Sequence, residues 1–313
     1  MEFDYPDSMN GHNAVRLVSP LLTLFMTVFS GAWAADLKQN TTDAFNRYVA
    51  VTEERMAGEL RSGREFLYPD RPAAELSKDL GDAYARLKRG EILVERQEAK
   101  VNGKDVEVPD GMVHHWVGVA FIPGANMAQT VAVVQDYDHR AELYKPEVTA
   151  AHVISHQGND YKIFMRLYQK RFTTVVFNTE YAIHWGQLNE KQIYANSVST
   201  RVAEVKDAAQ PNGPEVPVGH GNGYLWRLNT YWRFEEKDGG VYIQCEAVSL
   251  TRDIPFGLAW LLKPLVTKIP RQSLSRALGR TREVVLERMK GTEVRSSLYT
   301  NRSLKAAILG RSN

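Results

Sequence analysis

Charged and polar side chains recur at every second position of two segments of this chain, and this spacing could build a binding or catalytic site. Arg227, Tyr231 and Arg233 alternate with apolar residues in the first segment, and Gln244 and Glu246 do so in the second. Successive side chains of a β-strand point to opposite faces, so these residues share one face of a predicted sheet. Further polar residues expected on the same face are Arg166, Glu180 and His184.

The sequence allows two environments for this polar face. On the wet side of the sheet, the charged residues would form solvated cross-strand pairs that stabilise the fold only slightly. Inside a cavity they would need partners or a ligand, because an unpaired buried charge is too costly to persist. Glu246 or His184 would then serve as a catalytic base. Arg227 or Arg252 would polarise a carbonyl group.

Arg252-Asp253 lies where the last predicted strand meets the following helical segment. An arginine at that place would hold a carboxylate or a phosphate through two parallel hydrogen bonds. The alternative is local, with Asp253 capping the backbone and Arg252 on the surface. The sequence supports both interpretations equally.

The histidines and the single cysteine raise the question of a metal or thiol site. His114 and His115 are adjacent, and adjacent strand residues cannot both enter one site without a bulge. No H-E-x-x-H, G-x-S-x-G, P-loop or dinucleotide motif occurs. Cys245 falls on the apolar side of a predicted strand, which favours a small buried hydrophobic residue over a nucleophile. We therefore expect no metal and no cofactor.

The elements that must position these side chains are clearest in the last third of the chain. Residues 224–235 and 240–250 alternate apolar and polar side chains as half-buried strands do. Asp238-Gly239 between them predicts a type I′ turn, because both central residues of that turn need positive φ. The resulting register pairs Lys237 with Gly240, Phe234 with Ile243, Trp232 with Cys245, Tyr231 with Glu246 and Thr230 with Ala247.

A long amphipathic helix is predicted to follow this hairpin, with Leu274, Leu278 and Met289 on one face. Upstream, residues 112–122 are predicted to form a strand, followed by two short helices and four antiparallel strands joined by short turns. This order is that of a helix-grip fold. We therefore expect an α+β fold in which a curved antiparallel sheet wraps around a long C-terminal helix.

A helical N-terminal extension is predicted to precede this domain. Thr42 is a suitable cap for a helix over residues 42–61. Pro72 suits the first turn of a second helix that ends near residue 88. Asn102-Gly103 predicts a short hairpin.

Several short segments resemble the bacterial SRPBCC/START-like superfamily over residues 111–290. They are Gly223-Tyr224-Leu225-Trp226, Tyr231-Trp232-Arg233-Phe234-Glu235, Glu246-Ala247-Val248-Ser249-Leu250, Arg252-Asp253-Ile254-Pro255 and Ile269-Pro270-Arg271. Members of this superfamily resemble one another more in fold than in motif. The resemblance therefore implies the helix-grip fold first, and a cavity between sheet and helix second.

This resemblance implies a binding or carrier module that encloses an apolar small molecule such as a lipid, an isoprenoid or an aromatic polyketide. A mostly apolar wall with a few polar groups is typical of such sites. The expected ligand-binding residues are Phe177, Tyr181, Trp185, Trp226, Trp232, Phe234 and Arg252. Two alternatives stay open: a cyclase or dehydratase that uses Glu246, His184 and Arg227, and a structural envelope protein that binds another chain.

Composition and the N-terminal sequence limit the expected binding partners and cellular location. The net charge of +2 does not favour nucleic-acid binding, which needs a concentrated basic face. Arg16 precedes an apolar run over residues 17–29, and Ala32-Trp33-Ala34 matches a signal-peptidase site. We expect cleavage after Ala34 and a periplasmic or secreted protein, with peripheral membrane contact allowed and the oligomeric state open.

The expected organisation has four parts. These are a signal peptide at 1–34, a helical N-terminal extension with a short hairpin at 35–110, a START-like ligand-binding domain at 111–290 and a flexible basic tail at 291–313.

Overall fold

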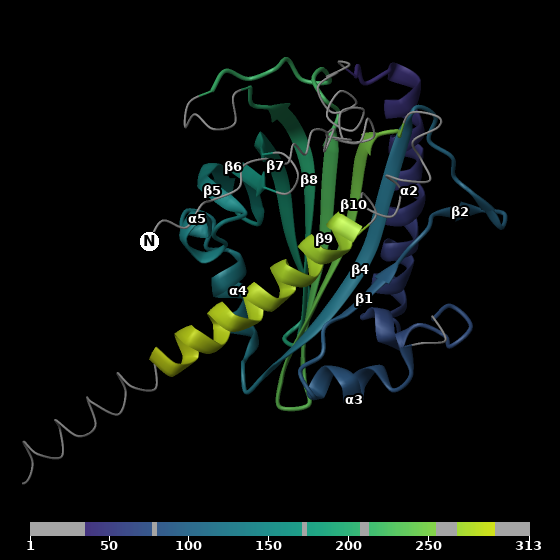
Figure 1. Ribbon diagram of the computed structural model, residues 1–313. Coiled ribbons are helices and arrows are strands. Elements are labelled where there is room, and N and C mark those ends of the chain that lie inside the picture. Colours follow the sequence, from purple (N-terminus) through teal and green to yellow (C-terminus); the bar gives the residue numbers. More distant parts are fainter. Residues whose placement is uncertain (1–34, 77–79, 171–173, 207–212, 255–267, 292–313) are drawn as a thin grey trace, which may run out of the picture. The chain divides into compact units, whose positions relative to one another are not determined.

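The computed structural model describes residues 35–76, 80–170, 174–206, 213–254 and 268–291. Its largest element is an eight-stranded antiparallel sheet of order β1-β4-β10-β9-β8-β7-β6-β5 (Figure 1). The strands are β1 (Leu93–Arg96), β4 (Gly111–Pro123), β5 (Val148–Gln157), β6 (Asp160–Lys170), β7 (Thr174–Asn189), β8 (Gln192–Glu204), β9 (Arg227–Lys237) and β10 (Gly240–Arg252). The predicted signal peptide and tail lie outside the described residues, except for residue 291.

Helices cover both faces of this sheet. A long C-terminal helix, residues 268–291, crosses one face, and α2 (Gln39–Ser62) runs along the other (Figure 1). The shorter helices are η1 (Tyr68–Asp70), α3 (Ala83–Lys88), α4 (Met127–Val134) and α5 (Arg140–Leu143). We call the face toward the C-terminal helix the inner face and the face toward α2 the outer face. The arrangement confirms the predicted α+β helix-grip fold.

The inner face packs against the C-terminal helix through one hydrophobic core. Ala120 of β4, Phe234 of β9 and Cys245 of β10 belong to this core together with Leu274 and Leu278 of the helix. Gly118 lets the helix come close, because a Cβ at that position would stand 2.6 Å from Leu278 Cδ1. The absence of a side chain on one strand residue therefore helps to fix where the helix crosses the sheet.

The predicted β9–β10 hairpin is confirmed in register and in turn type. Trp232 pairs with Cys245 and Tyr231 with Glu246. Asp238 and Gly239 have φ values of 57° and 75°, as a type I′ turn requires. The second predicted turn joins β2 (Lys100–Val101) to β3 (Lys104–Asp105), and its two central residues also have positive φ.

The N-terminal helices differ from the sequence prediction. Helix α2 begins at Gln39, and the Thr42 hydroxyl donates to the carbonyl of Lys38 at 3.2 Å instead of capping the helix. No helix starts at Pro72, where Glu75 N donates to Pro72 O at 2.8 Å in a single turn. A proline tolerates the first turn of a helix without requiring one. The short helix α3 begins later, where Asp82 accepts a hydrogen bond from Ala85 N.

The predicted N-terminal extension shares the sheet with the rest of the chain. Strand β1 pairs with β4 as an edge of the main sheet. The described residues from 35 on belong to one compact unit. No helix in the described ranges has the length and apolar composition needed to cross a membrane.

Candidate functional site

Stacked aromatic side chains form the centre of the inner face. The rings of Trp185 and Phe234 lie 5.7 Å apart and nearly parallel, and those of Trp232 and Phe234 lie 6.0 Å apart and parallel. Trp185 Nε1 donates to the hydroxyl of Tyr137 at 2.8 Å. Tyr181 belongs to the same cluster. These predicted ligand-binding residues therefore do lie together, on the side of the sheet that faces the C-terminal helix.

Burial divides this aromatic group. Phe234, Tyr181 and Trp185 are at most 4% exposed, so they are filled core. Trp232 is only partly buried, and so are Trp116 of β4 and Leu228 of β9, which pack against the same cluster. An apolar ligand could cover these three large side chains, which belong to the partly buried margin of the core.

One histidine joins this inner face. His114 is 5% exposed, and its Nε2 lies 3.1 Å from Thr251 Oγ1 at the end of β10. Burial, aided by the positive charge of Arg96, lowers the pKa of His114 to about 4. The imidazole is therefore neutral at physiological pH and acts as a hydrogen-bonding group.

The other predicted ligand-binding residues lie elsewhere or at the margin. Phe177 is buried on β7, on the same side as Tyr181 by strand alternation. Trp226 packs in the outer-face cluster with Val248 and Leu250. It precedes the first residue of β9, so the alternation that places Trp232 does not extend to it.

Arg252 is the last residue of β10, next to the predicted junction. Its guanidinium lies 5.9 Å from the centre of the Tyr224 ring, and its backbone N–H donates to Gly223 O at 2.8 Å. Asp253 Oδ1 accepts from Ile254 N at 2.7 Å. The anion-binding role of Arg252 stays a prediction.

The polar face of β9 and β10 is the outer face, and its central side chains are buried from solvent. Helix α2 covers it, and the polar residues of the strands meet charged residues from the N-terminal segment. Glu246 is 1% exposed, and its Oε1 lies 2.6 Å from His115 Nε2 and pairs with Arg55. Its Oε2 lies 3.4 Å from Arg71 Nη2. Glu246 is thus a buried carboxylate with cationic partners from α2 and the following loop.

Glu59 of α2 is the second buried carboxylate of this network. It lies 2.7 Å from Arg55, 3.0 Å from Arg71 Nε and 2.7 Å from Arg233 Nη2. Arg233 also donates to the carbonyl of Phe66 at 2.8 Å. Two glutamates and three arginines therefore join α2 to the sheet. We call these five residues the outer-face network: Arg55, Glu59, Arg71, Arg233 and Glu246.

A chain of hydrogen bonds links Ala99, Tyr48 and His115 to Glu246 of this network. Ala99 N donates to the Tyr48 hydroxyl at 3.0 Å, and that hydroxyl lies 2.9 Å from His115 Nδ1. If Tyr48 donates to Nδ1, the proton on Nε2 is free to donate to Glu246, and every group is satisfied. These hydrogen bonds hold the imidazole of His115 between helix α2 and the sheet.

The charges decide the protonation of Glu246. Burial alone would raise its pKa, but the Arg55 guanidinium, the hydrogen bond from His115 and the charge of Arg71 together lower it well below its ordinary value. Glu246 is therefore ionised, paired and shielded from solvent, as a structural carboxylate is.

The residues expected for catalysis do not form one site. Glu246 lies behind the sheet, under α2. His184 is exposed and pairs with Asp160 at 2.7 Å, while Arg227 donates to the carbonyl of Trp226 at 2.8 Å. No described contact links the three predicted catalytic residues.

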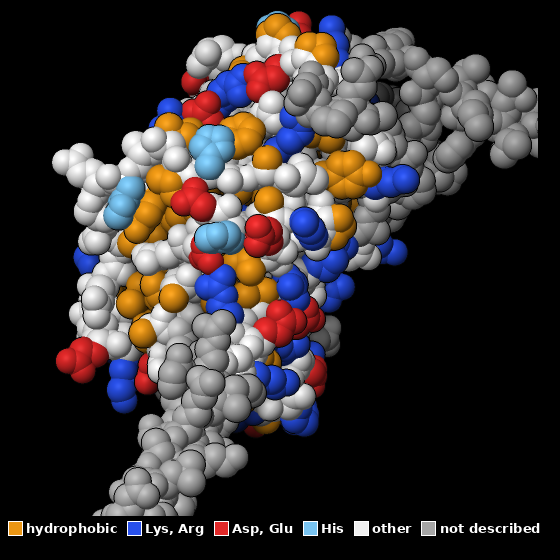
Figure 2. Space-filling view, turned by 90° about the vertical axis from the view of Figure 1, so that its left-hand side faces the viewer, with side chains coloured by type: hydrophobic (Ala, Val, Ile, Leu, Met, Phe, Trp, Pro, Cys, Tyr) orange, Lys and Arg blue, Asp and Glu red, His pale blue; other side chains and the backbone are white. Residues whose placement is uncertain are grey.

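Exposed histidines gather near the far edge of the sheet. Figure 2 shows histidine side chains beside acidic and hydrophobic ones on that side of the molecule. His152 and His156 of β5 stack on Phe164 and Tyr161, with ring centres 5.0 and 3.9 Å apart. Among the residues that the structure describes, no group of three or more potential metal ligands occurs.

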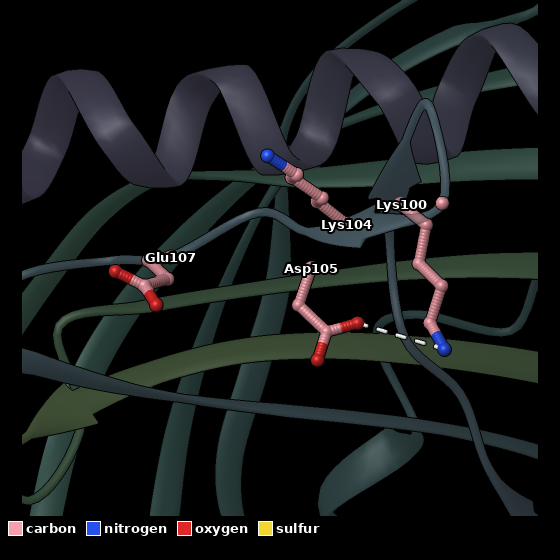
Figure 3. A pocket seen from close by; sticks show the side chains of 5 residues that line it. Lys100, Lys104, Asp105 and Glu107 are labelled. Atoms are coloured by element: carbon pink, nitrogen blue, oxygen red, sulfur yellow. Dashed lines mark ion pairs between the residues drawn. The ribbon is translucent and has the colours of Figure 1, made fainter.

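An open pocket lies on the β2–β3 hairpin, away from the inner face (Figure 3). Lys100, Lys104, Asp105 and Glu107 line it, and Lys100 pairs with Asp105 at 3.6 Å. Its lining is polar, exposed and drawn from one short segment. These are the properties of a surface hollow beside a turn.

The eight-stranded antiparallel sheet and the C-terminal helix across its inner face form a helix-grip fold. Human STARD10 has a TM-score of 0.43 at 11% identity, over 70% of this chain and 84% of its own. A STAR-related lipid transfer protein fragment from Xanthomonas axonopodis has a TM-score of 0.36 at 15% identity, and the match covers 58% of this chain and 97% of the fragment. The Zhui aromatase/cyclase from Streptomyces has a TM-score of 0.39 at 9% identity, and the match covers 57% of this chain and 96% of the cyclase. No protein-family model and no curated protein matches the sequence.

Sequence reasoning missed the residues that complete the polar face. Arg55 and Glu59 stand at helical i, i+4 spacing, and this spacing by itself indicates only a pair on a helix surface. Nothing in the sequence pattern links them to Glu246, which lies 191 residues from Arg55.

Proposed function

We propose that this protein is an exported binding or carrier module that holds an apolar small molecule against the inner face of its sheet. The observation that carries the proposal is the partial exposure of three large apolar side chains, Trp116, Leu228 and Trp232, next to the buried core of the inner face. Large apolar side chains left uncovered next to a packed core mark a surface that another apolar group can cover. The candidate ligands are lipids, isoprenoids and aromatic polyketides.

Binding is favoured over catalysis by where the ionisable groups lie. Glu246, the most deeply buried of the predicted catalytic residues, is already satisfied by Arg55, Arg71 and His115 on the outer face. A catalytic carboxylate needs access to a substrate. The inner face offers mainly apolar contact and neutral hydrogen-bonding groups such as His114.

The test is to purify the chain from residue 35 on, extract it with organic solvent and analyse the extract by mass spectrometry. A panel of lipids, isoprenoids and aromatic polyketides is then titrated against the delipidated protein. We expect an apolar compound to copurify, and its recovery to fall in the Trp232→Ala variant but not in the outer-face variant Phe164→Ala. Absence of any copurifying compound together with no binding across the panel would overturn the proposal.

Export is tested separately. Residues 1–34 carry the apolar run and the Ala32-Trp33-Ala34 site that support it. N-terminal sequencing of protein recovered outside the cytoplasm is expected to begin at Ala35, and Ala34→Glu should block processing. A protein that stays in the cytoplasm with its first residues intact would contradict this part of the proposal.

A further inference from the structure

Partly exposed side chains of three neighbouring strands form a continuous patch on the inner face. Trp116 of β4 pairs with Ala247 of β10, and Ala247 pairs with Thr230 of β9. All three are partly exposed, and so are Leu228 and Trp232, which lie two positions from Thr230 on the same face of β9. An alanine in the middle of a sheet is accessible only where the protein does not fill the space above it. We call these five residues the open patch.

His114 and Ser249 border the open patch. They pair with each other across β4 and β10. Strand alternation places His114 on the same face as Trp116, two residues away. Ser249 lies two residues from Ala247 and pairs with Leu228. The side chains of His114 and Ser249 are 5% and 7% exposed. Two polar groups therefore stand beside apolar surface that a ligand can cover.

The hydrogen bonds of His114 leave one of its ring nitrogens without a partner. Thr251 Oγ1 donates to Arg252 O at 3.2 Å, so it accepts from His114 Nε2, which lies 3.1 Å away. A neutral imidazole carries one proton, and this bond places that proton on Nε2. Nδ1 is therefore an acceptor, and it has no hydrogen-bond partner among the described residues.

The hydroxyl of Ser249 also has no hydrogen-bond partner in the part of the chain that the structure describes. Its oxygen is not sealed from solvent, unlike the unpartnered hydroxyl of Tyr181. An accessible polar group bonds to water until a ligand displaces that water. A ligand gains affinity over this exchange only if it reproduces the lost hydrogen bonds.

The polar groups beside the open patch are neutral. Burial keeps the imidazole of His114 uncharged at physiological pH. One cation, Arg96 of β1, pairs with Trp116 at the edge of the sheet. The side chain of Arg96 is 59% exposed and lies 3.8 Å from Glu98. Arg96 therefore faces solvent and a carboxylate of its own chain, which leaves His114 and Ser249 as the groups that a ligand meets on the inner face.

We propose that His114 and Ser249 recognise a neutral hydroxyl group, of an alcohol or a phenol, on the apolar ligand held by the open patch. This inference rests on the proposed function. A hydroxyl group donates one hydrogen bond and accepts others, so it donates to Nδ1 of His114 and accepts from the hydroxyl of Ser249. A methyl ether and an ionised carboxylate have no proton to give to Nδ1. The site therefore prefers an apolar alcohol to the matched ether and to the matched acid.

The experiment compares ligands that differ only in their polar group. Oleyl alcohol is compared with oleyl methyl ether and oleate, and naphthol with methoxynaphthalene and naphthoate, by displacement of a neutral fluorescent probe from the delipidated protein. The variants are His114→Phe, which keeps a ring without an acceptor, Ser249→Ala, and Arg96→Gln as a test for a charge effect. The matched controls are His152→Phe and Ser155→Ala on the exposed edge strand β5.

The wild-type protein should prefer the hydroxyl compound to its ether about tenfold in at least one series, which corresponds to about 1.4 kcal/mol. His114→Phe should abolish this preference and Ser249→Ala should reduce it, while the ether binds both variants as it binds the wild type. Arg96→Gln and the two controls should keep the preference in full. Unfolding midpoints show which variants are folded, and if His114→Phe does not fold, Ser249→Ala alone decides.

Equal affinity for hydroxyl and ether in both series would overturn the recognition of a hydroxyl group and leave the apolar binding function standing. A hydroxyl preference that is undiminished in the folded His114 and Ser249 variants would also overturn it. So would a preference for the acid that Arg96→Gln removes, because it would assign the ligand a charge. If no member of either series binds and no panel compound does, the proposed function and this inference fail together.

Discussion

Trp232 and Phe234 stand on the same face of β9 with parallel rings 6.0 Å apart, yet Phe234 is fully buried and Trp232 is not. Phe234 also stacks on Trp185, so it has aromatic neighbours on both sides. Two adjacent inner-face positions therefore have different roles. Phe234 closes the core, and Trp232 presents an aromatic surface that a ligand can use.

Truncation of these two aromatics should separate stability from binding. Phe234→Ala is expected to destabilise the protein by about 3–5 kcal/mol, because it leaves a cavity in a closed core. Trp232→Ala should cost less, because part of the indole contacts no protein atoms. Urea unfolding of both variants measures the difference. Equal losses of unfolding free energy would show that Trp232 is packed core as well.

Gly118 should be intolerant of a side chain. Its added Cβ would meet Leu278 Cδ1 at 2.6 Å and Leu274 Cγ at 3.1 Å, so Gly118→Ala must displace these leucine side chains or the C-terminal helix that carries them. We expect a loss of about 1–3 kcal/mol in unfolding free energy. Gly58 of α2 is the control, since its nearest contact would be 3.9 Å away and Gly58→Ala should be neutral or stabilising. A stable Gly118→Ala protein would contradict the helix placement.

Glu246→Gln should destabilise the protein strongly at neutral pH. The variant keeps Arg55 and Arg71 beside an uncharged side chain, and an uncompensated buried charge costs about 3–5 kcal/mol. Glu215→Gln, at the exposed pair with Arg201, should change stability by less than about 1 kcal/mol. Thermal and urea unfolding compare the two variants. Similar small effects would show that the outer-face network does not hold α2 to the sheet.

Glu246 should also make the folding stability depend on pH. The pKa of Glu246 is lowered in the folded state, so at acidic pH the unfolded chain binds a proton that the folded chain does not. Its stabilising contribution is present above the ordinary glutamate pKa of 4.5 and is lost as the pH falls below that value. Unfolding free energy measured between neutral and acidic pH should fall less in Glu246→Gln than in the wild type.

His114 should make stability depend on pH in a second range, separate from that of Glu246. Its folded-state pKa of about 4 lies below the ordinary value of 6.5, so between these values the unfolded chain takes up the proton. Stability is therefore lost as the pH falls from 6.5 toward 4, and His114→Gln should remove that slope. Ring chemical shifts of His114 in NMR spectra should stay constant down to about pH 5. Titration of the ring near 6.5 would contradict its burial as a neutral group.

Local signals predicted much of the fold correctly. Asp238-Gly239 determined the turn type, and the turn determined the register, so the pairing of Trp232 with Cys245 followed from sequence alone. Asn126, in a segment that follows a predicted strand, caps α4, with Gln129 completing the reciprocal hydrogen bonds. These features depend on residues that are close together in the chain, which is why pattern reasoning reached them.

The environment of the polar face could not be predicted in the same way. Alternation shows which residues share a face, but not which distant segment covers it. Arg71 and Glu246 meet across 175 positions of sequence. Trp226 was misplaced for a different reason. The strand begins at Arg227, three residues later than predicted, and the indole of Trp226 packs with Val248 and Leu250.

The most direct test of the account is the affinity of a neutral apolar ligand for Trp232→Ala and Phe164→Ala. Phe164 is a partly buried aromatic residue of β6 that stacks on His152, and it serves as the outer-face control. The ligand is the compound recovered from the purified protein or the strongest neutral binder of the panel, titrated against each delipidated variant. The account predicts that Trp232→Ala loses affinity and that Phe164→Ala keeps that of the wild type. Wild-type affinity in Trp232→Ala, or equal losses in both variants, would contradict an apolar site on the inner face.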